Sequence, residues 1–195
     1  MNDFRRKIMP AEELVRVLSR LRQDGKKIVH CHGTFDFVHR GHVHQFEQAK
    51  QLGDVLVVSV TTDRFVFKGP GRPVFKEDFR AEMIAALELV DYVSLNDAPT
   101  AVNLIKLLKP DVYIKGGGYA DSQKDLSQKI GIEAQAVGAV GGQMHFTHEI
   151  PIHSTPLLRN YIDPYPPDTL AYLNKLREKY SPRAVEVYLN QLKNL

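Results

Sequence analysis

Two histidines and two glycines crowd one short segment, Gly33-Thr34-Phe35-Asp36-Phe37-Val38-His39-Arg40-Gly41-His42. The segment follows an apolar run and precedes an amphipathic one, so we expect it to join the end of a strand to the start of a helix. A helix start presents unpaired N–H groups and the positive end of the helix dipole, and glycines let ligand oxygens approach the backbone. The segment is therefore a candidate phosphate site.

Read alone, the histidine pair leaves three interpretations open. A helix that begins at Gly41 would place His42 in its first turn and His39 just before it, so both rings could stabilise charge on one phosphate. The two side chains could equally be surface residues at a helix start. Zinc is the third interpretation, but one cysteine is too few for a structural site and the glycines suit phosphate better. The zinc interpretation arises because five histidines fall within fifteen residues: His30, His32, His39, His42 and His44.

The elements that must position this segment alternate along the chain. Apolar runs predict strands over residues 27–31, 54–61, 91–95, 111–115 and 143–148. Helical spacing predicts helices over residues 10–25, 43–52, 79–89, 100–108 and 130–140. This alternation favours a parallel sheet that binds ligands beyond the carboxyl ends of its strands. We therefore predict a Rossmann-like α/β domain with a five-stranded, mainly parallel sheet, followed by a helical C-terminal extension.

Composition and charge set the broad class. Hydrophobic residues make up 43% and charged residues 25% of the 195 residues, which is ordinary for a soluble globular protein with one core. The net charge of +3 is spread along the chain, so neither nucleic acid nor a membrane is indicated as a partner. The single cysteine, Cys31, excludes an internal disulfide, and residues 1–10 lack the apolar part of a secretory leader. We expect a cytoplasmic protein.

Several ordered motifs resemble those of the cytidylyltransferase-like nucleotidyltransferases. Gly33-Thr34-Phe35-Asp36 followed by His39-Arg40-Gly41-His42 is similar to the G-x-F-D and H-x-G-H signature of that superfamily. Residues 48–54, Arg72-Pro73, Lys115-Gly116-Gly117 and His153-Ser154-Thr155 follow in the order seen in the adenylyltransferase domain of bacterial heptose 1-phosphate enzymes. Glycerol-3-phosphate cytidylyltransferase has a similar order. The resemblance covers residues 12–163.

The resemblance implies a reaction in which a phosphomonoester oxygen attacks the α-phosphorus of a nucleoside triphosphate. Pyrophosphate leaves, and a nucleotide-activated sugar or polyol remains. Catalysis can rest on in-line positioning and charge neutralisation, with Mg²⁺ as the implied cofactor. The heptose-type likeness favours ATP and a sugar 1-phosphate, while CTP and glycerol 3-phosphate stay open. A homodimer is the oligomeric state expected from relatives.

The family's site residues are carried over motif by motif. Catalysis is assigned to His39, His42 and Lys68. Nucleotide contacts are assigned to Gly33, Thr34, Phe35, Gly41, Lys115, Gly116, Gly117, Ser154, Thr155 and Arg159. Contacts to the acceptor are assigned to Asp36, Arg72 and Arg80, and no residue is assigned to a metal. Structural roles are equally physical for several of these side chains, since Asp36 could cap a turn and both arginines could flank a helix start.

Two residues depart from the heptose-type pattern. Gly118 stands where those enzymes usually carry Asp, and Pro156 replaces a second Thr, a loss that Arg159 could offset by reaching a phosphate. These departures keep open an alternative from another class, a nucleotide-binding sensor or scaffold without turnover. RNA binding has no support in a chain this short and this weakly basic.

The resemblance also suggests how the chain is organised. A nucleotidyltransferase domain is expected over residues 1–163, with an N-terminal helix within residues 1–25. Residues 164–195 are predicted to form a Pro-rich linker and a helical extension. That extension resembles the connector to a sugar kinase domain in fused enzymes, so a further domain is expected to follow.

Overall fold

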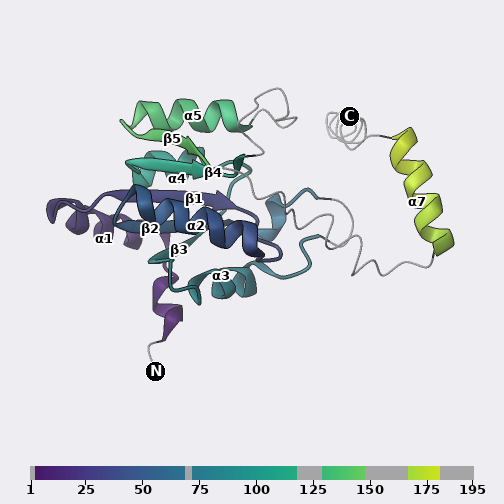
Figure 1. Cartoon of the computed structure of the whole chain (residues 1–195), viewed down its shortest axis with the longest axis horizontal. Coiled ribbons are helices and arrows are strands. Elements are labelled where there is room, and N and C mark those ends of the chain that lie inside the picture. Colours follow the sequence, from purple (N-terminus) through teal and green to yellow (C-terminus); the bar gives the residue numbers. More distant parts are fainter. Residues whose placement is uncertain (1–2, 69–71, 118–128, 148–166, 181–195) are drawn as a thin grey trace. The chain divides into compact units, whose positions relative to one another are not determined.

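A computed structural model describes residues 3–68, 72–117, 129–147 and 167–180 of the chain (Figure 1). The chain divides into two compact units, Met1–Ser154 and Thr155–Leu195. The described residues of the second unit contain helix α7 (Pro167–Lys179), which lies in the predicted helical extension. The predicted domain boundary after residue 163 falls outside the described residues and stays a prediction.

The first unit is built on a five-stranded sheet in which all strands are parallel (Figure 1). Its strands are β1 (Ile28–Gly33), β2 (Val55–Thr61), β3 (Tyr92–Asn96), β4 (Val112–Lys115) and β5 (Gln143–Phe146). Their spatial order is β3-β2-β1-β4-β5. The chain moves outwards from β1 on one side and then crosses to β4 on the other, so the topological switch point lies between β1 and β4. The predicted Rossmann-like sheet is confirmed.

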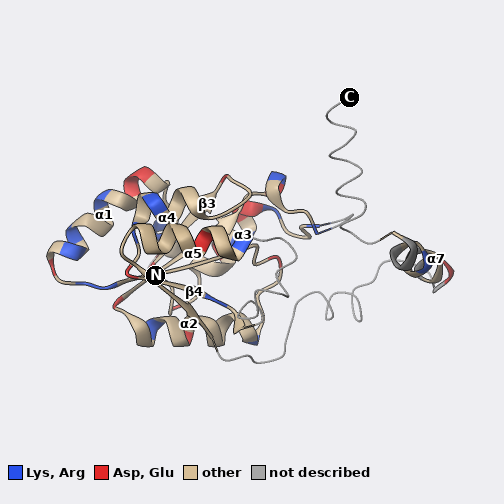
Figure 2. Ribbon diagram, turned by 90° about the horizontal axis from the view of Figure 1, so that it is seen from above, with Lys and Arg blue, Asp and Glu red and all other residues tan. Residues whose placement is uncertain are grey.

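Helices cover both faces of the sheet. They are η1 (Phe4–Lys7), α1 (Ala11–Gln23), α2 (Arg40–Leu52), η2 (Asp63–Phe65), α3 (Glu77–Ala85), α4 (Val102–Leu108) and α5 (Lys129–Ala139). Buried side chains of α2 and α3 pack with Val29, Leu56 and Val58, whereas those of α1 and α4 pack with Ile28 and Val57. Successive residues of a strand therefore face opposite helix layers. Figure 2 shows α2 on one side of the sheet and α1 with α4 on the other.

The junction between β1 and α2 is tighter than the sequence predicts. Strand β1 continues to Gly33, and α2 begins at Arg40 with His39 as its N-cap. The histidine side chain takes the place of the usual capping hydroxyl, which lets the helix start one residue before Gly41. The predicted phosphate segment is thus a short turn held between a sheet and a helix.

In the described part of the chain, no helix is both long enough and apolar enough to cross a membrane.

Candidate active site

The turn after β1 is held by the ring of Phe35. Phe35 has a φ of +50°, a left-handed conformation that costs a non-glycine residue about 1–2 kcal/mol. Its ring is only 4% exposed and packs against the rings of Phe46 and His42, so its burial offsets that cost. A Cβ on Gly33 would lie 3.0 Å from the Phe35 ring, which explains the glycine at this position. The tight turn brings the end of β1 to the start of α2.

His39 and His42 form a stacked pair at the N-terminus of α2. Their ring centroids lie 3.9 Å apart, and the rings are inclined by 26°. The Gly41 N–H donates to Nδ1 of His39 at 3.1 Å, and the His39 N–H donates to Nδ1 of His42 at 3.4 Å. A neutral imidazole whose Nδ1 accepts carries its proton on Nε2. For neutral rings the backbone therefore selects the tautomer in which each Nε2–H is a donor, a form that can hydrogen-bond a phosphate oxygen.

Asp36 ties this turn to the loop before α3. Its fully buried side chain accepts hydrogen bonds from the Val74 N–H at 2.7 Å and the Phe75 N–H at 3.2 Å, and it pairs with Nε of Arg72. These contacts hold the backbone of the loop before α3 in place. Its direct contact with an acceptor stays a prediction.

Arg72 and Lys68 are positive groups beside Asp36. The Arg72 side chain is 13% exposed, and among the described residues its buried Nη2 has no hydrogen-bond partner. A buried guanidinium donor left without an acceptor is unfavourable, so this atom suits an anionic ligand. The pKa of Lys68 is lowered, mainly by desolvation of its ammonium group and next by the positive charge of Arg72. The two predicted residues therefore lie close enough to act on one another's charge.

Arg80 has contacts of a different kind from those predicted. Its side chain is fully buried and donates to the carbonyl oxygens of Phe75 at 2.8 Å, Thr61 at 2.8 Å and Thr34, and to Asp63 Oδ1 at 2.7 Å. A guanidinium shared among four protein acceptors positions the surrounding loops. The predicted contact of Arg80 with an acceptor phosphate stays a prediction.

At the end of β4, Lys115 belongs to a buried network. Its ammonium pairs with Glu133 at 3.0 Å, and that carboxylate also accepts from the Tyr113 hydroxyl and the Ala101 N–H, each at 3.0 Å. Burial raises the pKa of Tyr113 well above its usual value, and the Glu133 charge adds to the effect. Sequence reasoning missed Glu133, because no motif marks a single glutamate within the pattern of α5.

One of the two glycines after Lys115 is hydrogen-bonded to Thr147. The Gly117 N–H donates to Oγ1 of Thr147 at 3.2 Å, and the Thr147 N–H donates to the Lys115 carbonyl at 2.9 Å. Among the described residues, no atom lies within 4 Å of a Cβ placed on Gly116. Open space beside Gly116 fits the predicted approach of a nucleotide to this backbone, which stays a prediction.

The remaining predicted site residues lie outside the described part of the chain. They are Ser154, Thr155 and Arg159, together with the two departures Gly118 and Pro156. Their predicted contacts with the nucleotide stay predictions.

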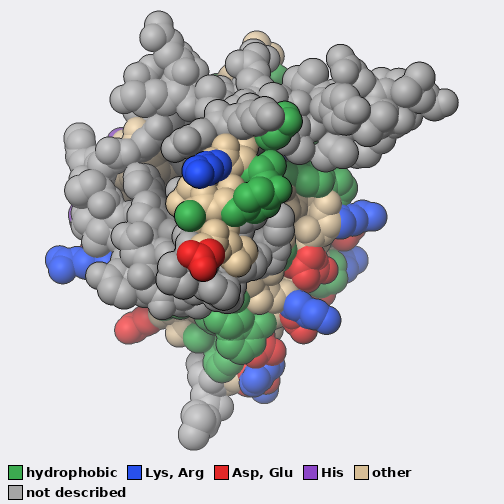
Figure 3. All heavy atoms as spheres, turned by 90° about the vertical axis from the view of Figure 1, so that its right-hand side faces the viewer, with side chains coloured by type: hydrophobic (Ala, Val, Ile, Leu, Met, Phe, Trp, Pro, Cys, Tyr) green, Lys and Arg blue, Asp and Glu red, His purple; other side chains and the backbone are tan. Residues whose placement is uncertain are grey.

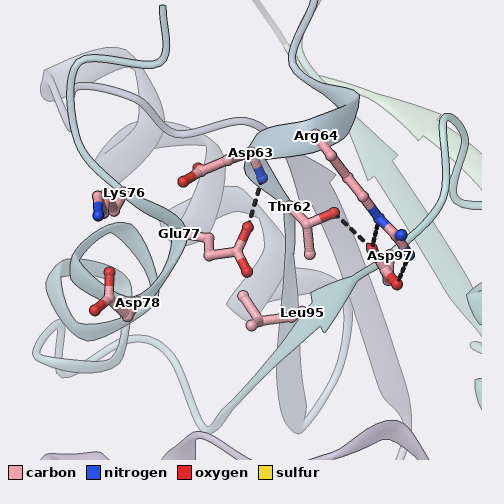
Figure 4. A pocket seen from close by; sticks show the side chains of 8 residues that line it. All are labelled: Thr62, Asp63, Arg64, Lys76, Glu77, Asp78, Leu95 and Asp97. Atoms are coloured by element: carbon pink, nitrogen blue, oxygen red, sulfur yellow. Dashed lines mark hydrogen bonds and ion pairs between the residues drawn. The ribbon is translucent and has the colours of Figure 1, made fainter.

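A polar pocket of about 810 Å³ opens where β2 and β3 end (Figure 4). In Figure 4 the Asp63 N–H donates to Glu77, and Thr62 and Arg64 both donate to Asp97. The lining residues are Thr62, Asp63, Arg64, Lys76, Glu77, Asp78, Leu95 and Asp97. Four carboxylates outnumber two cations in this lining, so the pocket does not suit a phosphate group. Figure 3 shows basic and acidic side chains of the described residues interspersed on one face, without a large patch of either sign.

The described residues contain no group of three or more His, Cys, Asp or Glu side chains placed to hold a metal ion. Magnesium is often held by only one or two protein carboxylates together with substrate phosphates and water. The predicted Mg²⁺ stays a prediction.

The fold is a Rossmann-like α/β domain that carries a stacked histidine pair at the start of α2. The chain belongs to the cytidylyltransferase-like family, whose model matches residues 30–160. The matched range includes β1, α2 and the Lys115–Gly117 segment, and it confirms the resemblance predicted from the motifs. Membership of this family agrees with the predicted enzyme class, a nucleotidyltransferase.

Relatives with curated names share this region. The bifunctional protein HldE of Campylobacter fetus is 42% identical over 142 residues, and that of Gluconobacter oxydans is 41% identical over 141 residues. These matches cover 72% and 70% of this chain but only 30% and 29% of the relatives. The chain therefore spans less than a third of the length of these relatives.

Solved structures share the fold. A lipopolysaccharide core biosynthesis protein from Thermoplasma volcanium is 28% identical with a TM-score of 0.50, and the match covers 63% of this chain and 94% of that protein. A pantoate-beta-alanine ligase from Francisella tularensis is 15% identical with a TM-score of 0.55, covering 88% of this chain and 77% of the ligase. The second likeness concerns the fold alone.

Proposed function

We propose that this chain transfers a nucleotidyl group from a nucleoside triphosphate to the phosphate of a sugar, with ATP and a sugar 1-phosphate as the favoured pair. An acceptor phosphate oxygen forms a bond to the α-phosphorus while the bond from that phosphorus to the β-phosphate oxygen breaks, releasing pyrophosphate. The stacked His39–His42 pair at the start of α2 is the observation that carries this proposal. The HldE relatives and the lipopolysaccharide core biosynthesis protein support a sugar phosphate as acceptor.

The histidine pair and the start of α2 suit the triphosphate. Two Nε2–H donors and the positive end of the helix dipole act on phosphate oxygens that gain charge as the bond to pyrophosphate breaks. Loss of one such donor typically lowers turnover by about 10²–10³. Magnesium, when bound with the triphosphate, would supply further charge neutralisation.

Arg72 and Lys68 suit the acceptor phosphate. The unpartnered Nη2 of Arg72 gains an acceptor when an anion binds, and Asp36 fixes the guanidinium by holding its Nε. The pKa of Lys68 is lowered mainly by desolvation and next by the charge of Arg72, and an added phosphate would offset the repulsion between the two cations. Both cations would bring the attacking oxygen close to the α-phosphorus despite the repulsion between two anions.

Pyrophosphate release tests the reaction. The wild-type chain is assayed with ATP, CTP, GTP and UTP, each paired with several sugar 1-phosphates and with glycerol 3-phosphate. Release should be fastest for ATP with a sugar 1-phosphate. Tight nucleotide binding without release from any pair would contradict the proposal and favour a sensor.

A matched pair of variants tests the acceptor site. Arg72→Met should raise the KM for the acceptor about tenfold or more while leaving the nucleotide dissociation constant unchanged, because it removes a charge-assisted contact. Arg16→Met removes an exposed arginine of α1 and should change neither quantity. An Arg72→Met variant that weakens nucleotide binding instead would place the triphosphate at Arg72.

A homodimer, a cytoplasmic location and a following sugar kinase domain stay predictions of the resemblance. Light scattering of the purified chain checks the first of these, and a mass of twice 22.1 kDa is the expected result.

A further inference from the structure

Four polar side chains are buried in a row beneath the candidate active site. His30 and His32 of β1 and Ser59 and Thr61 of β2 are between 0% and 9% exposed. They occupy the alternate strand positions that, nearer the start of each strand, carry apolar residues packed on α1 and α4. Burial of polar groups on a sheet face is unfavourable unless each finds a hydrogen-bond partner.

These side chains are joined in one continuous hydrogen-bond chain. Oγ of Ser59 lies 2.8 Å from Nε2 of His30 and 2.8 Å from Nδ1 of His32. Nε2 of His32 lies 3.4 Å from Oγ1 of Thr61, which in turn lies 3.3 Å from the carbonyl oxygen of Gly33. The chain therefore runs from the interior of the sheet to the first residue of the phosphate-binding turn.

The final acceptor fixes the direction of every bond in the chain. A carbonyl oxygen only accepts, so the Thr61 hydroxyl donates to Gly33 and must accept from the Nε2–H of His32. Nδ1 of His32 then lacks a proton and accepts from the Ser59 hydroxyl, which accepts from the Nε2–H of His30. Nδ1 of His30 is left as a bare acceptor, and it has no hydrogen-bond partner within the described ranges.

This proton order requires both histidines to be neutral. Burial lowers the pKa of His30 to about 3, with the nearby charge of His32 the next cause. Burial also lowers the pKa of His32 well below its usual value, and the charge of Lys115 adds to the effect. Burial therefore favours the neutral rings that this order of hydrogen bonds requires.

The chain ends on a peptide group that the proposed reaction uses. The Gly33 carbonyl and the Thr34 N–H belong to one planar trans peptide and point in opposite directions. Thr61 holds the Gly33 carbonyl with its hydroxyl, while its own carbonyl accepts from Arg80, which also binds the Thr34 carbonyl. Holding the Gly33 carbonyl on the Thr61 side directs the Thr34 N–H away from Thr61.

We propose that the His30–Ser59–His32–Thr61 chain positions the Gly33–Thr34 peptide so that the Thr34 N–H donates to the bound triphosphate. Thr61 is then the positioning residue of the nucleotide site, and Ser59 sets the tautomer of His32 that Thr61 needs. This inference rests on the proposed function. It assigns a role to side chains that do not themselves touch the substrates.

Three variants test the chain by nucleotide affinity, measured by calorimetry with ATP. Thr61→Val keeps the shape of the side chain but removes the hydroxyl, and it should weaken ATP binding about tenfold with the acceptor KM unchanged. Thr61→Ser restores the hydroxyl and should restore the affinity. Ser94→Ala is the matched control. Ser94 of β3 is buried and lies beside Ser59 of β2. Within the described ranges its hydroxyl has no hydrogen-bond partner.

A second measurement observes the protons of the hydrogen-bond chain directly in the wild-type protein, and it does not require activity. Nitrogen NMR of the imidazoles should show both His30 and His32 as neutral rings protonated at Nε2, and Ser59→Ala should perturb the signals of both. Protonation of His32 at Nδ1, or a charged ring at pH 7.5, would overturn the proposed order of the chain.

The two proposals fail in different ways. A wild-type protein that binds no nucleotide contradicts the proposed function. The NMR signals still decide the proton order of the hydrogen-bond chain in that case. A wild-type chain that binds ATP, together with a folded Thr61→Val variant of equal affinity, overturns the positioning role alone.

Discussion

Lowering the pH from 7.5 to 5.5 should reduce the free energy of unfolding by about 2.7 kcal/mol through His30 and His32 alone. In the folded chain both rings are held uncharged, because burial lowers the pKa of His30 to about 3 and that of His32 well below its usual value. In the unfolded chain each imidazole regains a pKa of about 6.5 and takes up a proton as the pH falls.

The sign follows from proton uptake. Below about pH 6.5 the unfolded state binds more protons than the folded state, so acid favours unfolding. The contribution of the two neutral histidines to the free energy of unfolding is fully present well above pH 6.5. It falls with pH until the pKa of the folded state is reached, near 3 for His30. At pH 5.5, one unit below the unfolded pKa, each histidine accounts for about 1.4 kcal/mol, which gives about 2.7 kcal/mol for the pair.

Urea unfolding at the two pH values measures the effect in the wild type and in His30→Phe. The phenylalanine keeps an aromatic ring beside Tyr113 and removes one titrating group, so the loss between pH 7.5 and 5.5 should shrink by about 1.4 kcal/mol. Val58→Ala, which opens a core site but keeps both histidines, should lower stability by similar amounts at both pH values. An unchanged pH dependence in His30→Phe would refute the reasoning that this ring is buried and uncharged.

Three further substitutions probe the turn between β1 and α2. His42→Ala should lower turnover by about 10²–10³ because it removes a donor to the phosphate. Loss of its contact with the His39 N–H should lower the free energy of unfolding by about 1 kcal/mol. A variant that unfolds outright would show that His42 is a core residue instead. Asp36→Asn should destabilise the fold by about 3 kcal/mol in urea unfolding, because it breaks a buried pair with Arg72; a loss below about 1 kcal/mol would show that the pair contributes little. Gly33→Ala should cost about 1–3 kcal/mol because its Cβ would press on the Phe35 ring, and a neutral effect would mean that the ring moves aside freely.

The sheet and the start of α2 could be predicted because their signals are local. Apolar runs marked the strands, and a change to helical spacing after Gly41 marked the helix. The exact start at Arg40 could not be predicted, because capping by an imidazole depends on the stacked geometry of His39 and His42 rather than on a standard capping residue.

Long-range pairings of charged side chains were beyond the sequence. Nothing in the pattern of α3 shows that Arg80 turns inward to four acceptors, or that Glu133 of α5 reaches Lys115 of β4. Such contacts depend on where helices pack over strands. Without that packing, an arginine near a candidate phosphate loop suggests a ligand contact just as well as a structural one.

The buried polar row did leave a signal. His30 and His32 lie two residues apart at the end of the first strand, which was predicted to stop at Cys31, and Ser59 and Thr61 lie two apart in the next predicted strand. Polar residues with the period of a strand, near the carboxyl ends of two adjacent strands, indicate a hydrogen-bonded face. Because five histidines lie close together in the sequence, His30 and His32 were instead considered as zinc ligands.

The reaction product tests the central claim most directly. Phosphorus NMR of the wild-type chain with ATP, Mg²⁺ and a sugar 1-phosphate follows every phosphate species in a single experiment. We predict that the signals of a new diphosphate ester and of pyrophosphate grow in equal amounts as ATP and the sugar phosphate are consumed. ATP that stays intact with every sugar 1-phosphate, or that yields inorganic phosphate and ADP, would contradict nucleotidyl transfer.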